Sequence, residues 1–280
     1  MPSTLSPSSA RPLIASAQPP VVLSAAGSDC SAGAGVQADL KTFTALGCYG
    51  MTALTSVVAE TSVFVKSIQL LDGAIVEDQI TVLLEGFPVS AAKTGMLGGR
   101  EQIKAAVKAF RAYKTSMPMV VDPVMIATSG ASLLEPDAVE VMTNELFPLA
   151  TVLTPNLDEA AALLGHKISS REGMEDSAAK LAERYGCAIL LKGGHLEGSH
   201  VPDILHENGQ VDWLEGNRIE GVNTHGTGCT YSAAITAGLA HRLSLLDAVK
   251  QAKRFVTQAI AQHHHWSDLQ ALNQSVRLVD

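Results

Sequence analysis

Residues 223–229 (NTHGTGC) form a glycine-punctuated turn that runs directly into a helical pattern at residues 229–243. The glycines allow successive backbone N–H groups to converge at the helix start, where unpaired amides and the helix dipole favour a phosphoryl group or a similar anion. The same field lowers the pKa of a thiol, which makes Cys229 a candidate proton acceptor. Considered alone, the segment is explained equally well by a tight turn with an ordinary helix cap.

Polar side chains follow two predicted strands further along the chain. Asp122 closes one strand-like run, and Asn156 with Glu159 follows another. An asparagine with a glutamate three residues later is a capping-box pattern, which is a sufficient structural explanation. Carboxylate and amide oxygens at strand ends also suit a hydrated Mg²⁺ ion held together with substrate phosphates. Taken alone, the capping box is the simpler interpretation.

Two further segments could contact a ligand. Lys192 ends a predicted strand, and the two glycines after it leave room for its side chain to reach a phosphate, although such loops are common. The loop at residues 26–39 (AGSDCSAGAGVQAD) is rich in glycine and carries Asp29 as a hydrogen-bond acceptor. We interpret this loop as a substrate loop, and a flexible loop without a ligand is the alternative.

Three consecutive histidines at residues 263–265 suggest a metal site at first sight. Consecutive residues on a helix point in different directions, so these side chains cannot easily share one ion. We therefore expect a solvated helix end there.

Short β-prone runs alternate with helical patterns along most of the chain, and these elements must position the polar residues. The alternation predicts an α/β fold with a mainly parallel sheet covered on both faces, whose ligands collect at the carboxyl ends of the strands. Residues 207–209 (ENG) supply the turn of a predicted hairpin at 202–214. The predicted strands are 21–25, 51–58, 90–93, 118–122, 150–154 and 188–192, and the predicted helices are 35–46, 77–84, 100–113, 136–146, 157–164, 174–185, 229–243 and 245–263.

The composition indicates a globular domain and limits the kinds of partner that this chain can bind. With 280 residues, of which 46% are hydrophobic and 17% charged, the chain can bury a full core, and we expect one domain at residues 21–280. The net charge of −8, with no run of Lys and Arg, disfavours nucleic acid as a partner. The sequence also lacks the roughly 18 uninterrupted apolar residues that a membrane-spanning helix needs. The expected partner is therefore a small molecule.

The cysteines and the N-terminal residues bear on the compartment. Four cysteines without CxxC or zinc-type spacing fit reduced thiols, which predicts the cytoplasm. Residues 1–20 are rich in Ser, Pro and Ala and carry a single charge at Arg11, so we expect a disordered tail. An organelle-targeting role for this tail stays open, because it contains no acidic residue.

Taken together, the motifs resemble the hydroxymethylpyrimidine/phosphomethylpyrimidine kinase family of thiamine biosynthesis, within the ribokinase-like superfamily. The resemblance spans residues 21–262, and segments in a matching order are far more specific than any one of them. It implies a three-layer α/β/α fold with a mainly parallel central sheet and little or no separate lid. The segments that carry it are AGSDCSAGAGVQADLKTFTALGCYGMTALTSVVAE, KTGMLG, VVDPVM, TPNLDEAAALLG, LKGGH and NTHGTGCT.

The resemblance implies a reaction. It is ATP-dependent phosphorylation of 4-amino-5-hydroxymethyl-2-methylpyrimidine and then of its monophosphate, with ATP and Mg²⁺ and in a homodimer. The matching turn implies that Gly226, Thr227 and Gly228 form the anion hole and that Cys229 is the catalytic base. Phosphoryl transfer depends mainly on positioning and charge neutralisation, so the amides and Mg²⁺ should matter more than the base.

The resemblance also implies the remaining site residues. Lys192, Asn156 and Thr227 would bind ATP, and Asp122 and Glu159 would hold the metal. The residues expected to line the pyrimidine pocket are Gly27, Asp39, Glu60 and Met96.

The chain departs from the family pattern at two places. Glu60 replaces a glutamine, so it can accept a hydrogen bond from an exocyclic amine but cannot donate one to a ring nitrogen unless it is protonated. A histidine-containing tail segment of the family is also missing. The departure at Glu60 concerns the substrate and not the reaction type.

Two alternatives stay open. A pyridoxal or pyridoxine kinase on the same scaffold is a close second, because both substrates are small aromatic heterocycles that bear a hydroxymethyl group. A non-catalytic binder of thiamine precursors is the third. The presence of Asp122, Glu159, Lys192 and Cys229 argues against this third alternative.

Overall fold

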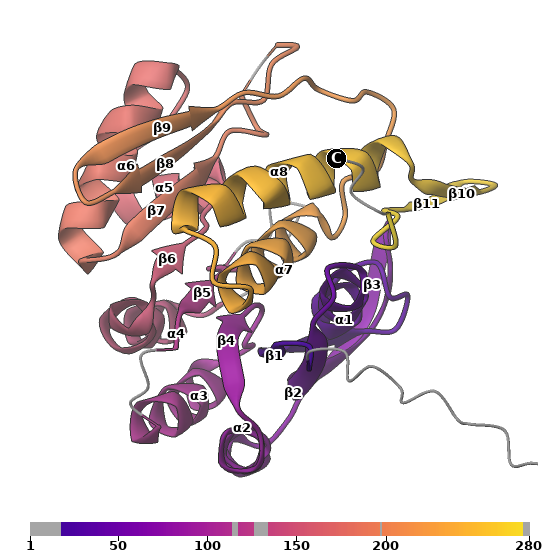
Figure 1. Cartoon of the computed structure of the whole chain (residues 1–280), viewed down its shortest axis with the longest axis vertical. Coiled ribbons are helices and arrows are strands. Elements are labelled where there is room, and N and C mark those ends of the chain that lie inside the picture. Colours follow the sequence, from indigo (N-terminus) through magenta and orange to yellow (C-terminus); the bar gives the residue numbers. More distant parts are fainter. Residues whose placement is uncertain (1–17, 114–116, 126–133, 197, 277–280) are drawn as a thin grey trace, which may run out of the picture.

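Among residues 18–113, 117–125, 134–196 and 198–276, which the structure describes, nine strands form one sheet in this computed structural model (Figure 1). The strands are β1 (Val21–Asp29), β2 (Tyr49–Thr61), β3 (Phe64–Leu70), β4 (Val89–Thr94), β5 (Met119–Val121), β6 (Val152–Leu153), β7 (Ala188–Lys192), β8 (Asp203–Glu207) and β9 (Gln210–Leu214). Most of the tail expected at residues 1–20 lies outside the described residues.

The strand order across the sheet is β3-β2-β1-β4-β5-β6-β7-β8-β9. The six strands from β2 to β7 in this order pair in parallel, whereas β3, β8 and β9 pair antiparallel with their neighbours. The predicted mainly parallel sheet is confirmed. Parallel strands place their carboxyl ends at one edge, so the loops at that edge bring distant residues together.

Helices cover both faces of this sheet (Figure 1). One face packs against α1 (Gly35–Ala45), α7 (Thr227–Ala240) and α8 (Leu245–Ala261). The other face packs against α2 (Gly73–Gly86), α3 (Arg100–Ala112), α4 (Pro136–Val141), α5 (Leu157–Leu164) and α6 (Arg171–Tyr185). The expected three-layer α/β/α architecture is therefore confirmed.

Alternate residues of the central strands face opposite helix layers. In β5, Met119 and Val121 belong to the core beneath α2–α6, whereas Val120 belongs to the core beneath α7 and α8. Burial on both faces explains why these strands are continuous apolar runs rather than alternating ones. Each fully buried Val, Leu or Ile side chain stabilises the fold by about 1.5–3 kcal/mol, so the sheet gives the loops at its edge a rigid base.

Three parts of the chain differ from the sequence predictions. β3 was not predicted, and neither was a small hairpin of β10 (His264–Trp266) and β11 (Leu269–Ala271). Because α8 already ends at Ala261, the predicted helical end at the three histidines is wrong, and His264 and His265 lie exposed on β10. α4 is shorter than the predicted helix and continues as a π-helical turn at Met142–Leu146.

The hairpin predicted at residues 202–214 is confirmed by β8 and β9. Its turn residues Asn208 and Gly209 have φ values of 50° and 78°, the left-handed backbone that a tight two-residue hairpin turn requires. The start of α7 at Thr227 lies two residues before the predicted one, so the glycine turn belongs to the helix N-terminus itself.

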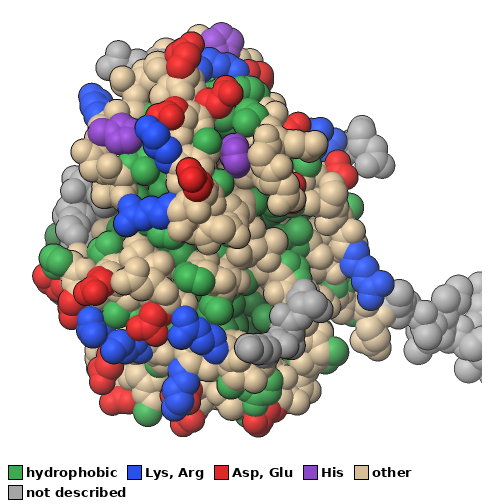
Figure 2. Space-filling model, turned by 90° about the vertical axis from the view of Figure 1, so that its left-hand side faces the viewer, with side chains coloured by type: hydrophobic (Ala, Val, Ile, Leu, Met, Phe, Trp, Pro, Cys, Tyr) green, Lys and Arg blue, Asp and Glu red, His purple; other side chains and the backbone are tan. Residues whose placement is uncertain are grey.

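The surface is of mixed character. On the face shown in Figure 2, basic and acidic side chains lie interspersed, with hydrophobic side chains exposed between them. Every residue of β3 is exposed, and its apolar side chains include Phe64, Val65, Ile68 and Leu70. Within the part of the chain that the structure describes, no helix has the length and apolarity needed to cross a membrane.

Candidate active site

The helix α7 begins with an uncapped turn. Its N-cap residue, Gly226, has a φ of 84° and offers no side chain to the first-turn amides. A Cβ atom at this position would lie 2.0 Å from the carbonyl oxygen of Gly33, so only glycine fits. The hydroxyl oxygen of Thr227 is buried without a hydrogen-bond partner among the described residues. The Thr227 N–H donates to the Thr224 carbonyl over 3.1 Å, so the Thr227 hydroxyl is the group at this helix start that has no protein partner among the described residues.

Asp122 and Lys192 meet this turn. Asp122 directly follows β5 and Lys192 ends β7, and the lysine Nζ lies 3.1 Å from the Asp122 Oδ1. A Cβ atom at Gly228 would lie 3.4 Å from both the Asp122 Oδ2 and the Lys192 Nζ. Ser232, on the next turn of α7, donates to the Asp122 Oδ2 over 3.3 Å. The structure thus brings together the glycine turn, a carboxylate and an ammonium group from three distant parts of the sequence.

Asn156 and Glu159 form the predicted capping box at the start of α5. The Asn156 Oδ1 accepts from the Glu159 N–H over 2.9 Å, and the Glu159 Oε2 accepts from the Asn156 N–H over 2.8 Å. Burial raises the pKa of Glu159 to about 7; Lys192 opposes this shift, and Asp122 adds to it. The structural interpretation of this motif is confirmed, and its carboxylate also lies within electrostatic reach of Asp122.

The pKa of the Cys229 thiol differs from the sequence-based expectation. Burial raises its pKa to about 11, while the charge of Lys93 and the N–H of Gly35 act in the opposite direction. The expectation that the helix field gives a low thiol pKa is therefore wrong, because removal of the sulfur from water outweighs the helix dipole. At neutral pH this thiol is protonated.

The residues expected around the pyrimidine separate into two groups. The N–H of Gly27 donates to the Met96 carbonyl over 3.0 Å, and a Cβ atom at Gly27 would lie 2.9 Å from the Met96 Cε, so these two residues are in contact. Glu60, near the end of β2, is half-buried. Gly27 and Glu60 lie in the carboxyl halves of β1 and β2, and Met96 follows β4.

Asp39 differs from the expectation that it lines this pocket. It is fully buried, and its Oδ1 accepts from the Lys93 Nζ over 2.9 Å while its Oδ2 accepts from the Ser24 hydroxyl over 2.6 Å. A lysine fully buried within the sheet needs a paired carboxylate, since an uncompensated buried charge is strongly destabilising. Asp39 therefore compensates Lys93 behind the pocket instead of facing it.

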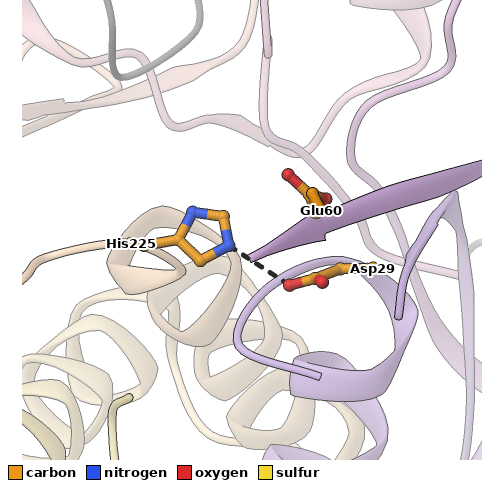
Figure 3. A group of neighbouring side chains, drawn as sticks. All are labelled: Asp29, Glu60 and His225. Carbon is orange, nitrogen blue, oxygen red and sulfur yellow. Dashed lines mark hydrogen bonds and ion pairs between the residues drawn. The ribbon is translucent and has the colours of Figure 1, made fainter. Parts of the chain in front are cut away.

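Asp29, Glu60 and His225 lie together at the rim of the site, and sequence reasoning gave His225 no role (Figure 3). The His225 Nε2 lies 3.2 Å from the Asp29 Oδ2. Burial alone would raise the pKa of Asp29, but hydrogen bonds from His225, Ser31 and the loop amides hold it well below its usual range. The bond to Asp29 raises the pKa of His225, which favours the charged imidazole.

An open hollow of about 670 Å³ lies beside the loop that follows Lys192. Arg218 fixes part of this loop by donating to the carbonyl oxygens of Leu196 and Gly198. The sequence contained no motif that pointed to Arg218. The residues that line the hollow are Gly194, His195, Leu196, Gly198, Ser199, Arg218 and Glu220.

The sequence profile of a family described as phosphomethylpyrimidine kinase matches residues 29–272, which include every site residue above except Gly27. The hydroxymethylpyrimidine/phosphomethylpyrimidine kinase of Rhizobium meliloti is 44% identical to this chain over 242 residues, which make up 86% of this chain and 90% of that relative.

Solved structures are similar over most of the chain. The pyridoxal kinase of Staphylococcus aureus in complex with ADP superposes with a TM-score of 0.85 at 37% identity, covering 92% of this chain and 94% of the other. The phosphomethylpyrimidine kinase of Clostridium difficile superposes with a TM-score of 0.77 at 37% identity, covering 87% of this chain and 100% of the other. The two structures thus differ in the substrate that their names give.

Proposed function

The chain belongs to the phosphomethylpyrimidine kinase family, and from this premise we propose that it transfers the γ-phosphoryl group of ATP to 4-amino-5-hydroxymethyl-2-methylpyrimidine and then to its monophosphate. Both steps belong to thiamine biosynthesis. The observation that carries the proposal is the meeting of an uncapped helix start with Asp122 and Lys192 at one edge of the sheet. Charge that develops during phosphoryl transfer needs donors and cations that are already in place, and these groups supply both.

The turn at the start of α7 forms the proposed anion hole. Backbone N–H groups at Gly226, Thr227 and Gly228 would donate to oxygens of the transferred phosphoryl group, and the Thr227 N–H would exchange its bond to the Thr224 carbonyl for one to such an oxygen. The Thr227 hydroxyl has no partner in the part of the chain that the structure describes, and this supports a role in binding ATP, because a phosphate oxygen would restore the free energy that a buried, unbonded hydroxyl costs. The Lys192 ammonium, which has three donors, would contact the same phosphates.

Cys229 is the proposed base. Its sulfur would take the proton of the substrate hydroxymethyl group as that oxygen attacks the γ-phosphorus and the bond from phosphorus to ADP breaks. Because the thiol is protonated at neutral pH in the resting protein, only a small fraction is ready for this role, and the charge of Lys93 favours that fraction. The base should therefore contribute less to the rate than the anion hole.

Asp122 and Glu159 would hold Mg²⁺. The donor set fits, because Mg²⁺ takes carboxylate oxygens together with substrate phosphates. The raised pKa of Glu159, to which burial and the nearby Asp122 both contribute, supports this assignment, since a divalent cation would relieve the repulsion between the two carboxylates. When bound, the ion would neutralise phosphate charge. Asn156 would then help to place the nucleotide, as its amide is already fixed by the capping box.

The pyrimidine and ATP would bind on two sides of the carboxyl edge of the sheet. Gly27, Met96 and Glu60 would contact the pyrimidine, with the Glu60 carboxylate accepting from the exocyclic amine. Asp39 would act only by keeping Lys93 charged and in place. The hollow beside the loop after Lys192 has room for the base and ribose of ATP, within the range of 300–1,000 Å³ typical of ligand sites.

A pyridoxal kinase is the second candidate function. The close superposition with the pyridoxal kinase of Staphylococcus aureus supports it. Glu60 bears on the choice, since a carboxylate at this position suits a substrate that carries an amine, as the pyrimidine does.

We also propose a homodimer built on β3. Among the described residues, no strand pairs with the outer edge of β3, and this strand exposes four large apolar side chains, Phe64, Val65, Ile68 and Leu70. Antiparallel pairing with the same strand of a second copy would satisfy both features. The four cysteines are free thiols, which supports the cytoplasm as the compartment.

The test of the function is a phosphorylation assay of the purified protein with ATP, Mg²⁺ and a panel of pyrimidine and pyridoxal vitamers, with products resolved by mass. We expect one and then two phosphoryl additions to the hydroxymethylpyrimidine. A kcat/KM at least as high for pyridoxal would replace the substrate assignment. Tight binding of the pyrimidine without ATP turnover would instead favour a non-catalytic binder.

A further inference from the structure

We infer that Asp29 and His225 are positioning residues whose ion pair clamps the loop after β1 onto the turn before α7, and thereby holds the N-termini of α1 and α7 together around Cys229. The inference rests on the proposed kinase function, because it concerns the same anion hole. Neither residue is expected to touch the substrate. The clamp acts through the geometry of the turn.

The loop side of the clamp is anchored on one carboxylate. The Asp29 Oδ1 accepts from both the N–H and the hydroxyl of Ser31, each over 2.7 Å. The Asp29 Oδ2 accepts from the N–H groups of Gly33 and Ala34 over 3.1 and 2.8 Å. With the side chain almost fully buried, the loop at residues 29–34 is wound around this carboxylate. Any group bonded to Asp29 is therefore tied to the whole loop.

The turn side of the clamp is anchored through His225. Its backbone N–H donates to the Asn223 Oδ1 over 2.9 Å, and the Asn223 side-chain amide donates to the Ser62 carbonyl over 3.0 Å, at the tip of the β2–β3 hairpin. The imidazole then reaches across to the Asp29 Oδ2 over 3.2 Å (Figure 3). His225 immediately precedes Gly226, so a movement of the imidazole would move the anion hole.

The two anchored segments meet directly beside the clamp. Gly226 packs so tightly on the Gly33 carbonyl that a Cβ atom would lie 2.0 Å away. The same carbonyl accepts from the Gln274 side chain over 3.1 Å, which closes the loop from its other side. At the first residue of α1, the Gly35 N–H bonds to the Cys229 thiol and partly offsets the rise in its pKa that burial causes. Two helix N-termini thus converge on one site, where their dipoles add to favour an anion.

The charges around His225 favour the closed clamp. The groups that face the imidazole are Asp29 from β1 and Glu60 from β2, and Cys30 contacts the backbone of Glu60. The hydrogen bond that the His225 Nε2 donates to Asp29 is the main reason that the pKa of His225 is raised, and the charge of Glu60 adds to it. Burial and then Asp29 raise the pKa of Glu60 in turn. A charged imidazole between two acids is therefore the favoured state.

The spacing of Asp29, Glu60 and His225 would also fit a metal ion, since donor atoms of all three lie within 4.8 Å of one another. Both Asp29 oxygens, however, already accept the hydrogen bonds that shape the loop. A metal ion would have to displace the backbone and hydroxyl donors of the loop as well as the imidazole. The ion pair between Asp29 and His225, with Glu60 beside it, explains why the three side chains lie together and needs no such rearrangement.

The sign of the pH dependence follows from the raised pKa of His225. The stabilising contribution of the pair is fully present below the ordinary histidine value of 6.5 and is lost as the pH rises through the raised value. The anion hole should loosen in that alkaline range. Phosphoryl transfer would then lose rate while ATP and alcohol binding, which depend on many other contacts, change little.

The test compares three variants of the full chain in the pyrimidine kinase assay. His225→Ala should lower kcat by about 10²-fold, because a misplacement of about 1 Å at a reacting centre costs that much, and should leave KM for ATP nearly unchanged. His225→Gln places an amide donor near the position of the Nε2 and cannot titrate. It should recover most of the lost kcat and lack the alkaline decline of kcat that wild type shows. Asp29→Asn should behave like His225→Ala.

Titration of the His225 imidazole by NMR, assigned by its absence in His225→Gln, gives a readout that does not need catalysis. We expect a pKa above 6.5 in wild type that falls toward 6.5 in Asp29→Asn. An unshifted imidazole pKa, or a His225→Gln profile identical to wild type, would overturn the clamp. If wild type phosphorylates no vitamer while the NMR shift is present, the clamp stands and the proposed function fails. A spectrum of His225 that changes with micromolar Zn²⁺ while kcat stays constant would favour a metal site and overturn the clamp.

Discussion

The N-termini of α5 and α7 lie at the same edge of the sheet, and they use their backbone amides in opposite ways. At α5, the Asn156 side chain caps the helix and the Glu159 carboxylate returns to the backbone N–H of Asn156. At α7, Gly226 offers no side chain, and the buried Thr227 hydroxyl has no partner among the described residues. A capped helix start stabilises the fold, whereas an uncapped one is left ready for a ligand.

The two helix starts also differ in what they contribute to the stability of the fold. A side-chain cap contributes about 1 kcal/mol, which α7 gives up, and Gly226 adds the conformational entropy of a glycine in the unfolded chain. The two helix starts are nevertheless linked, because Asn156 and Lys192 form a parallel bridge and Lys192 reaches Asp122. The rigid α5 start thus supports the open α7 start, and substitutions at the two places should affect different quantities.

The largest effect should come from closing the open turn. Gly226→Ala would place a Cβ atom 2.0 Å from the Gly33 carbonyl on a backbone that L-residues avoid, so the turn must move. We expect a loss of kcat of about 10³-fold, the upper range for removal of a preorganised oxyanion donor. Steady-state kinetics with the pyrimidine alcohol measures it.

Gly165 provides the matched control. It ends α5 with a φ of 78°, but a Cβ atom there would meet no described residue within 4 Å. Gly165→Ala should therefore cost about 1–2 kcal/mol of stability from its backbone alone and leave kcat unchanged. Equal kinetic losses in Gly226→Ala and Gly165→Ala would mean that the turn has no special role.

The second effect concerns the thiol at the open turn. Cys229→Ala should lower kcat by about 10²-fold, the low end for a general base, because the thiol is mostly protonated in the resting protein. Substrate binding, measured by calorimetry, should remain nearly intact. Unchanged turnover would show that the sulfur is not a required base.

The third effect concerns Glu159, whose replacement should increase the stability of the ligand-free fold and weaken the response of the rate to Mg²⁺. Burial raises the pKa of Glu159 to about 7; Lys192 opposes this shift, and Asp122 adds to it. Because the folded-state pKa lies above the ordinary value of 4.5, the stabilising contribution of the protonated carboxyl is present below that value and is lost as the pH rises through about 7. Ionised Glu159 should therefore weaken the ligand-free fold on the alkaline side.

Glu159→Gln removes that ionisation. The variant should gain stability relative to wild type between about pH 5 and about pH 8, by about 2–3 kcal/mol, and should need about tenfold more Mg²⁺ for half-maximal rate. Urea unfolding at both pH values and a Mg²⁺ titration of the rate are the measurements. Parallel stability curves for the two proteins would argue against a strained carboxyl.

The smallest effect should come from the capped helix start. Asn156→Ala removes the side-chain bond to the N–H of Glu159 and should cost about 1 kcal/mol of unfolding free energy. Its KM for ATP should rise modestly, since the capping box also fixes the backbone beside Lys192. A rate loss as large as that of Gly226→Ala would remove the distinction between the two helix starts.

Much of this architecture could be predicted from the sequence. The alternation of strands and helices indicated the parallel sheet, and the ordered motifs placed Asp122, Lys192 and residues 226–229 at one edge, where the structure brings them together. Such features are local patterns, or follow from the rule that parallel strands share a carboxyl edge.

Other features depend on tertiary packing and could not be predicted from local patterns. Cys229 has a high pKa because neighbouring elements remove it from water, and Asp39 is hidden because Lys93 is buried opposite it. The strand β3 reads FVKSIQL, without regular alternation, and is held by its pairing with β2. The role of His225 depends on its contact with Asp29, which lies 196 positions away in the chain.

The most direct test of the central claim is a crystal structure of the protein with Mg²⁺, a non-hydrolysable ATP analogue and the hydroxymethylpyrimidine. We predict that oxygens of the γ-phosphate lie about 2.7–3.2 Å from backbone nitrogens of residues 226–228 and from the Lys192 Nζ. A γ-phosphate bound away from the start of α7, with the amides of that turn facing only protein or solvent, would contradict the account.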